Sequence, residues 1–166
     1  FRLPNEPFRI SEFTGPGFER YCRQLDQARD GVWEEIQTVV RTFAPAAVGL
    51  TITSPLLASA VKTARLIKEV DPRIVVIAVG PHVTLDWKSV LGRPDIDIGV
   101  LGEGEATIVE LAGALENRLD LSRVRGLVYR KGEEFVVTEP RPLAGELDAL
   151  VSPHEFAPQV DRKSVV

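Results

Sequence analysis

The hydrophobic positions of this chain fall into three short runs rich in β-branched residues, separated by segments whose apolar residues recur at helical spacing. The runs are Ala47–Thr53, Ile74–Val79 and Ile96–Leu101. Each is almost continuously apolar, as is typical of parallel strands that helices cover on both faces. Because a segment of helical period follows each run, the pattern predicts strand–helix units in series and a doubly wound, mostly parallel α/β sheet.

Local signals bound the helices. Ser54-Pro55 pairs a good N-cap with a proline at the first helical position, and Asp71-Pro72 ends the same segment. The expected helices cover Val32–Thr42, Ser54–Val70, Asp86–Leu91 and Thr107–Leu119, the last with a buried stripe of Ile108, Leu111, Ala112 and Leu115.

Beyond the last helix the period changes to two. Leu127–Arg130 and Phe135–Thr138 flank a glycine turn and predict a β-hairpin over 125–138. Phe8–Phe13 is a further candidate strand, and the tail is rich in proline. We therefore divide the chain into an irregular and helical N-terminal segment (1–44), an α/β domain (45–140) and a linker (141–166).

Composition indicates a soluble globular domain. The 166 residues suffice for one domain, and the net charge of -4 disfavours general binding to nucleic acids or anionic membranes. No apolar run approaches the roughly 20 residues of a transmembrane helix. The single cysteine, Cys22, excludes an intramolecular disulfide and is interpreted as a packing residue, so a cytoplasmic location is expected. The chain begins without Met, and we expect it to be a fragment or trimmed.

Two glycine-bearing loops follow the second and third runs: Gly80-Pro81-His82 and Gly102-Glu103-Gly104-Glu105. The carboxyl ends of parallel strands line the ligand crevice of such sheets, so these loops predict a binding site. A phosphate cradle is disfavoured, because the carboxylates would repel the anion and Thr107 breaks the G-x-G-x-x-G pattern. Glu103 and Glu105 fit an acid/base pair, but stabilisation by the helix dipole is the favoured interpretation.

Four other polar residues have structural interpretations that are favoured over chemical ones. Ser54 is predicted to be an N-cap and not a nucleophile, since no histidine and acid stand in positions to activate it. His82 is predicted to be a surface or packing residue more than a cofactor contact, and His154 to be inert. Thr107 is predicted to cap its helix.

The ordered segments PAAVGLTITSPLLASAVKTARLIKEVDPRIVVIAVGPHVT, DIDIGVLGEGEATIVELAGAL and VRGLVYRKGEEFVVTEPRPLAGELDAL resemble the cobalamin-binding domain that precedes the catalytic barrel of radical S-adenosylmethionine enzymes. The resemblance covers Pro45–Pro153. It implies a flavodoxin-like (Rossmann-like) sheet with cobalamin across its carboxyl edge. The cofactor-binding residues that it implies are Thr53, Ser54, Pro55, Gly80, Pro81, His82, Gly102, Glu103, Gly104 and Glu105.

Two motifs of related proteins are missing. Without the Asp-x-His-x-x-Gly motif of methionine-synthase-like modules, cobalamin is expected to bind without a histidine ligand. Without CxxxCxxC, the chain is not expected to perform radical chemistry by itself. The resemblance therefore implies methyl transfer or rearrangement chemistry on a separate barrel domain, the expected partner, which would hold S-adenosylmethionine and the iron–sulfur cluster.

Two alternatives use the same fold. One is a docking or scaffold domain that binds no cofactor. The other is a receiver-like signalling domain, which needs a phosphorylatable Asp directly after a strand. It is disfavoured because Asp95 and Asp97 precede their strand.

Overall fold

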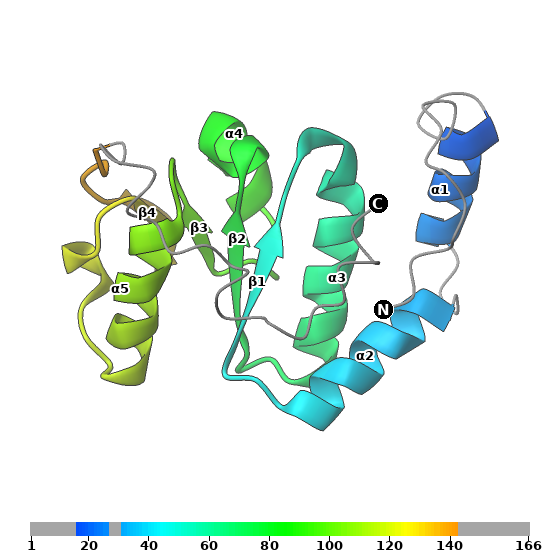
Figure 1. Cartoon of the computed structure of the whole chain (residues 1–166), viewed down its shortest axis with the longest axis horizontal. Helices are drawn as coiled ribbons and strands as arrows, with labels where there is room; N and C mark the ends of the chain where they lie inside the picture. Colours follow the sequence, from blue (N-terminus) through cyan, green and yellow to red (C-terminus); the bar gives the residue numbers. More distant parts are fainter. Residues whose placement is uncertain (1–15, 27–30, 143–166) are drawn as a thin grey trace, which may run out of the picture.

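Five strands form one sheet whose spatial order follows the sequence, β1-β2-β3-β4-β5. Figure 1 shows β1 to β4 in this order. A computed structural model describes residues 16–26 and 31–142. Strands β1 (Ala47–Thr51), β2 (Val75–Val79) and β3 (Ile98–Val100) are parallel. Strands β4 (Leu127–Lys131) and β5 (Glu134–Val137) extend the sheet in antiparallel fashion. The carboxyl ends of the three parallel strands consequently share one edge.

Helices cover both faces of this sheet, which confirms the predicted doubly wound class. Helices α3 and α4 connect consecutive parallel strands, and right-handed crossovers of this kind place both on the same face. Helix α5 packs on the opposite face. The helical elements are α1 (Pro16–Asp26), α2 (Gly31–Phe43), η2 (Ser54–Leu56), α3 (Leu57–Val70), α4 (Pro81–Leu91), α5 (Glu105–Glu116) and η3 (Leu121–Arg123).

The alternation of side chains along β2 divides the core into two layers. Val76 and Ala78 are buried with the residues of α3 and α4, whereas Ile77 is buried with Leu111 of α5. Because both faces of β2 are covered, its sequence is apolar throughout instead of alternating with polar residues.

Helix α4 begins five residues earlier than the pattern predicts. Gly80 is its N-cap and Pro81 stands at the first helical position. The helical period is interrupted at Asp86, whose φ of -145° and ψ of 60° are not helical. This kink explains why the apolar pattern indicated only the second half of the helix.

Helix α5 buries a different stripe from the predicted one. Leu111 is buried as expected, but Ile108 and Ala112 are exposed, and the other buried residues are Thr107 and Ala114. Small and apolar residues occur around most of this helix, so periodicity alone does not fix which side meets the sheet.

The remaining predictions concern the hairpin and the chain ends. The hairpin is confirmed, with Lys131 opposite Glu134 and a φ of +65° at Gly132. The candidate strand Phe8–Phe13, His154 and residues 143–166 of the predicted linker lie outside the described residues. Cys22 is half-buried on α1. Within residues 16–26 and 31–142, no helix has the length and apolar character needed to cross a membrane.

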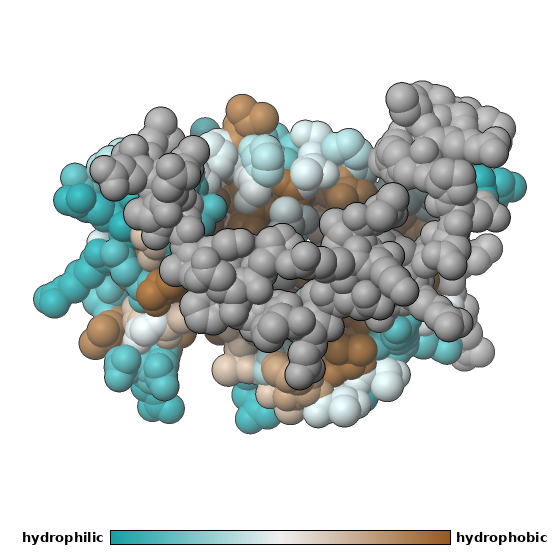
Figure 2. Space-filling view, in the orientation of Figure 1, coloured by the Kyte–Doolittle hydropathy of each residue, from teal (hydrophilic) through white to brown (hydrophobic). Residues whose placement is uncertain are grey.

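Apolar side chains also reach the surface. Figure 2 shows apolar areas (brown) among hydrophilic ones (teal). The most exposed large apolar side chains of the described residues are Leu85, Phe43 and Val109, with 81%, 80% and 72% of their surface accessible. They belong to α4, α2 and α5, so part of the apolar surface of these three helices is not used in the described core.

Candidate functional site

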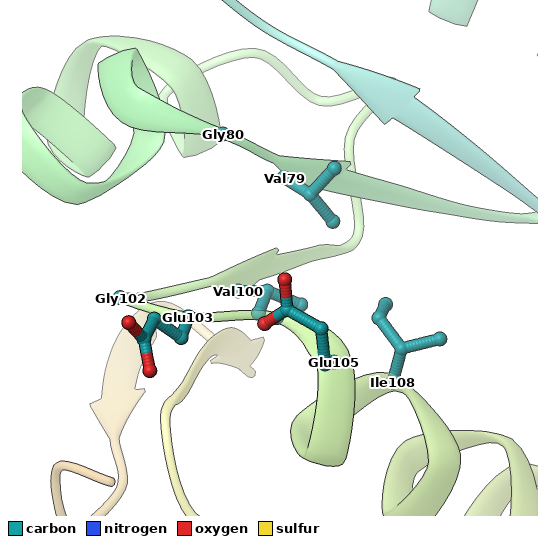
Figure 3. A pocket seen from close by; sticks show the side chains of 8 residues that line it. Val79, Gly80, Val100, Gly102, Glu103, Glu105 and Ile108 are labelled. Carbon is teal, nitrogen blue, oxygen red and sulfur yellow. The ribbon is translucent and has the colours of Figure 1, made fainter. Parts of the chain in front are cut away.

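A pocket of about 450 Å³ lies at the carboxyl ends of β2 and β3 (Figure 3). This volume is within the range of small-molecule sites, about 300–1,000 Å³. Apolar side chains and the two glycine loops form its wall. The lining residues are Val79, Gly80, Val100, Gly102, Glu103, Gly104, Glu105 and Ile108.

The pocket brings together half of the ten predicted site residues. These are Gly80, Gly102, Glu103, Gly104 and Glu105. The other five (Thr53, Ser54, Pro55, Pro81 and His82) belong to the same edge of the sheet but do not line this pocket.

Sequence reasoning missed three lining residues, Val79, Val100 and Ile108. Val79 and Val100 are the last residues of β2 and β3, so their position at strand ends was the available signal. Ile108 was assigned to the buried stripe of α5, whereas it is 37% exposed and faces the pocket.

Gly80 brings the ends of β1 and β2 close together. Its φ is +108°, and a Cβ atom at this position would lie 2.9 Å from the carbonyl oxygen of Ile52. The same carbonyl accepts a hydrogen bond from the amide of His82 at 3.2 Å. A side chain at position 80 would therefore push the loop after β2 away from the loop after β1.

Ser54 and His82 form a hydrogen bond between these two loops, with Oγ and Nδ1 2.9 Å apart. The N-cap prediction for Ser54 is wrong, because that position belongs to Thr53 and no side chain caps the helix. A histidine does lie beside Ser54, because the fold brings together residues that are 28 positions apart.

The pair nevertheless lacks the third group of a catalytic triad. The other ring nitrogen of His82, Nε2, lies 3.5 Å from Ser89 Oγ, at the limit of a hydrogen bond. In the described part of the chain no carboxylate is recorded as a partner of this ring. The geometry thus indicates that His82 orients loops and does not activate a nucleophile.

Thr84, two residues further along α4, reaches the third loop. Its Oγ1 accepts a hydrogen bond from the amide of Gly102 at 2.9 Å. His82 and Thr84 therefore tie the start of α4 to the loops that follow β1 and β3. Through these contacts, the first turn of α4 connects all three loops at the carboxyl edge.

Two carboxylates belong to the pocket wall. Glu105 lies in the first turn of α5, where the helix dipole favours a negative charge. In Figure 3 its side chain extends from the helix toward the ends of β2 and β3, while Glu103 lies on the side of Gly102. This acidic wall offers hydrogen-bond acceptors to a ligand and is unsuited to a phosphate group.

Thr107 has a different role from the predicted one. It is fully buried, whereas the N-cap of α5 is Gly104, so the capping prediction is wrong. Its Oγ1 donates to the carbonyl oxygen of Arg125 at 3.3 Å and accepts from Nε of Arg141 at 2.9 Å.

Side chains that hold metal ions are not grouped in the described residues. Across 16–26 and 31–142, no set of three or more His, Cys, Asp or Glu side chains is arranged to bind a metal.

Residues 13–112 match the family described as "B12 binding domain". The match spans both glycine loops and all the lining residues of the pocket. The chain belongs to the B12-binding domain family.

This B12-binding domain is similar in sequence to parts of proteins named as methyltransferases. It is 32% identical over 127 residues to an uncharacterized methyltransferase of Pyrococcus horikoshii, covering 76% of this chain and 28% of that protein. It is 38% identical over 78 residues to the cobalamin-dependent radical SAM methyltransferase TokK of Streptomyces tokunonensis, covering 46% of this chain and 12% of that protein. An anaerobic magnesium-protoporphyrin IX monomethyl ester cyclase of Synechocystis is 37% identical over 83 residues, 49% of this chain and 17% of the cyclase.

Solved structures share the fold. The radical S-adenosylmethionine methyltransferase TsrM of Kitasatospora setae, solved with cobalamin and a [4Fe-4S] cluster, has a TM-score of 0.60 at 19% identity, over 79% of this chain and 23% of TsrM. The cobalamin-dependent radical enzyme OxsB, solved with aqua-cobalamin and S-adenosylmethionine, has a TM-score of 0.60 at 18% identity, over 67% of this chain and 16% of OxsB.

These matches confirm the predicted family, fold and cofactor. Cobalamin is the cofactor of this B12-binding domain, which resembles that of cobalamin-dependent radical SAM methyltransferases. They do not favour the cofactor-free docking alternative. The chain spans less than a third of the length of each relative named above.

Proposed function

We propose that cobalamin binds across the carboxyl edge of β1, β2 and β3, with the pocket between the two glycine loops as the centre of its site. The supporting observation is this pocket, which lies inside the segment matched by the B12-binding family. The residues that we infer to contact the cofactor are Thr53, Ser54, Pro55, Gly80, Pro81, His82, Gly102, Glu103, Gly104 and Glu105, together with Val79, Val100 and Ile108.

The chain's residues have distinct parts in this binding. Val79, Val100 and Ile108 would pack against apolar parts of the ligand and exclude water. The carboxylates of Glu103 and Glu105 would accept hydrogen bonds from amide groups at the rim of the corrin. His82 and Thr84, through Ser54 and the amide of Gly102, would hold the loops in place.

We infer that no described histidine ligates the cobalt. His82 does not line the pocket, and its Nδ1 is engaged with Ser54. When bound, cobalamin supplies a cobalt centre suited to carrying a methyl group or to radical chemistry.

For the whole protein we propose methyl transfer or a rearrangement carried out by a separate radical S-adenosylmethionine barrel domain, which would hold S-adenosylmethionine and the iron–sulfur cluster. The support is that the relatives TokK and TsrM are named as such methyltransferases. Residues 45–140 would be the cofactor-binding unit and 141–166 the connection to that barrel. A cytoplasmic location stays a prediction.

Titration of the purified chain with hydroxocobalamin, followed by the visible spectrum and by co-elution in gel filtration, tests the proposed site. The decisive variant is Gly102→Leu, which places a side chain at the pocket wall. Gly132→Leu is the matched control, because both glycines have a positive φ and open space at the Cβ position, and Gly132 lies at the remote hairpin turn.

We expect the wild-type chain and Gly132→Leu to bind alike, and Gly102→Leu to bind at least about tenfold more weakly, a loss of about 1.4 kcal/mol. His82→Ala should leave the spectrum of the bound cofactor unchanged in shape. A wild-type chain that does not bind hydroxocobalamin would contradict the function. Equal binding by Gly102→Leu would contradict the location of the site.

A further inference from the structure

The segment that leaves β5 is joined by main-chain hydrogen bonds to the pocket loop. The amide of Gly126 donates to the carbonyl oxygen of Glu139, and the amide of Leu101 donates to the carbonyl oxygen of Gly126, each at 2.8 Å. Leu101 directly precedes Gly102 of the pocket wall. A single residue, Gly126, therefore lies between the pocket loop and the departing segment.

The three segments cross at close range. Gly126 has a φ of +76°, and a Cβ atom there would lie 3.1 Å from Thr107 Oγ1 and 3.2 Å from the carbonyl oxygen of Leu101. The absence of a side chain at this position lets helix α5 and the loop after β3 approach the turn that leads into β4.

Arg141 fastens the departing segment to α5. Its Nε donates to Thr107 Oγ1 at 2.9 Å, and its terminal nitrogen donates to Glu110 Oε2 at 2.6 Å. Only 18% of the Arg141 side chain is exposed, and Thr107 is fully buried. Pro140 and Pro142 flank the arginine and restrict the backbone on both sides. The guanidinium of Arg141 thus makes two partly buried hydrogen bonds from a segment whose backbone is restricted.

The anchor points of Arg141 alternate along α5 with pocket residues. Glu105 and Ile108 line the pocket, while Thr107 and Glu110 receive the arginine. Because these residues share the first two turns of one helix, a rotation of that helix would move both sets together. The pocket wall and the departing segment therefore have one common rigid element.

We propose that Arg141 is a positioning residue that couples the segment leaving the sheet to the wall of the cobalamin pocket. Arg141 holds the first two turns of α5 in the orientation that places Glu105 and Ile108 at the pocket. By reciprocity, a ligand that favours this orientation stabilises the attachment of residues 139–142. The proposal rests on the proposed function, since cobalamin is the ligand concerned.

A second arginine at the same crossing provides a matched control. Arg125 pairs with Glu139 at 3.1 Å, but the two side chains are 51% and 67% exposed. Exposed pairs contribute little, and among the described residues the Arg125 side chain has no hydrogen bond or ion pair with α5. Removing this side chain leaves the α5 anchor in place.

Affinity for hydroxocobalamin is the first measurement. We expect Arg141→Ala to bind at least about fivefold more weakly than the wild type, the lower end of usual coupling effects. Arg141→Lys should lie between them, because lysine keeps the charge for Glu110 but not the fork that also reaches Thr107. Thr107→Ser should behave as the wild type, Thr107→Val should be weakened, and Arg125→Ala should stay within about twofold.

Hydrogen exchange followed by mass spectrometry separates positioning from general loss of stability. Without cofactor, Arg141→Ala and Arg141→Lys should raise exchange in residues 102–110 and leave β2 at its wild-type rate. In the wild type, hydroxocobalamin should lower exchange in residues 137–142, and this protection should be lost in both variants. Circular dichroism identifies any variant that does not fold, in which case the remaining Arg141 and Thr107 variants decide.

The outcomes of the two proposals are distinguishable. If the wild type does not bind hydroxocobalamin, the proposed function fails, and exchange of the cofactor-free variants alone decides the role of Arg141. If the wild type binds and the Arg141 variants match it in affinity and exchange, the coupling is overturned. Raised exchange that spreads equally to β2 would also overturn it, because that result reports general destabilisation.

Discussion

Gly80 and Gly102 occur in similar loops at the ends of neighbouring strands, but they have different structural roles. A Cβ atom at Gly80 would meet the backbone of Ile52, whereas one at Gly102 would meet nothing within 4 Å. Gly80 is therefore needed by the fold, and Gly102 leaves space at the pocket wall. The sequence predicted both as ligand-approach glycines, since a strand end followed by glycine is the same local pattern in each case.

Gly80→Ala is expected to destabilise the chain more than Gly132→Ala. The φ of +108° at Gly80 belongs to a region that is almost restricted to glycine, and the added Cβ meets a carbonyl oxygen at 2.9 Å. A cost of about 2–3 kcal/mol is expected, against about 1 kcal/mol for the strain at Gly132, which has open space. Urea unfolding of both variants measures the difference, and equal midpoints would contradict this account.

At the scale of elements, the turns between helices and strands are held by short-range polar contacts. Asp71 follows α3 and precedes β2, and its amide donates to the carbonyl oxygen of Ile67. Its two carboxylate oxygens accept hydrogen bonds from the backbone and side chain of Arg73. Here the sequence was sufficient to end the helix, since Asp71-Pro72 is a strong local stop signal.

The contact between Asp71 and Arg73 predicts a dependence of stability on pH. Hydrogen bonds from the Arg73 side chain and then from its amide lower the pKa of Asp71 from 3.8 to about 2. A folded-state pKa below the unfolded one stabilises the fold above pH 3.8, and this contribution is lost as the pH falls from about 4 to about 2.

Asp71→Asn removes that contribution at every pH. The difference in urea midpoint between the wild type and this variant should therefore have its largest value at pH 6. It should decrease as the pH falls from 4 to 2. A difference that stays constant down to pH 2 would contradict the assignment.

At the scale of the whole molecule, the carboxyl and amino ends of the parallel strands have different functions. The carboxyl edge carries the pocket, and the amino edge carries a polar cluster around Lys68. Lys68 Nζ donates to Asp97 Oδ2 at 2.6 Å and to the carbonyl oxygen of Ile74 at 2.7 Å. Asp97 Oδ2 also accepts from the amide of Val76 at 2.7 Å. This cluster joins the end of α3 to the starts of β2 and β3.

Lys68→Met is expected to lower stability and leave the pocket intact. The lysine side chain is 17% exposed, and loss of its charged hydrogen bonds should cost about 1–2 kcal/mol, measured by urea unfolding. Affinity for hydroxocobalamin should stay within about twofold, because the cluster and the pocket lie at opposite edges. Arg65→Met is the control, since the Arg65–Glu69 pair is exposed and should contribute at most about 0.5 kcal/mol. A large loss of affinity in Lys68→Met would show that the edges are not independent.

The sequence by itself determined the order of strands and helices, the two glycine loops and the hairpin, because each depends on local periodicity or on a turn residue. Only the tertiary structure decided which stripe of α5 faces the sheet, that Ser54 meets His82, that Thr84 holds Gly102 and that Arg141 reaches Thr107. These contacts join residues 18 to 34 positions apart. The type of a side chain leaves many possible partners for it. The packing of the helices on the sheet selects one of them.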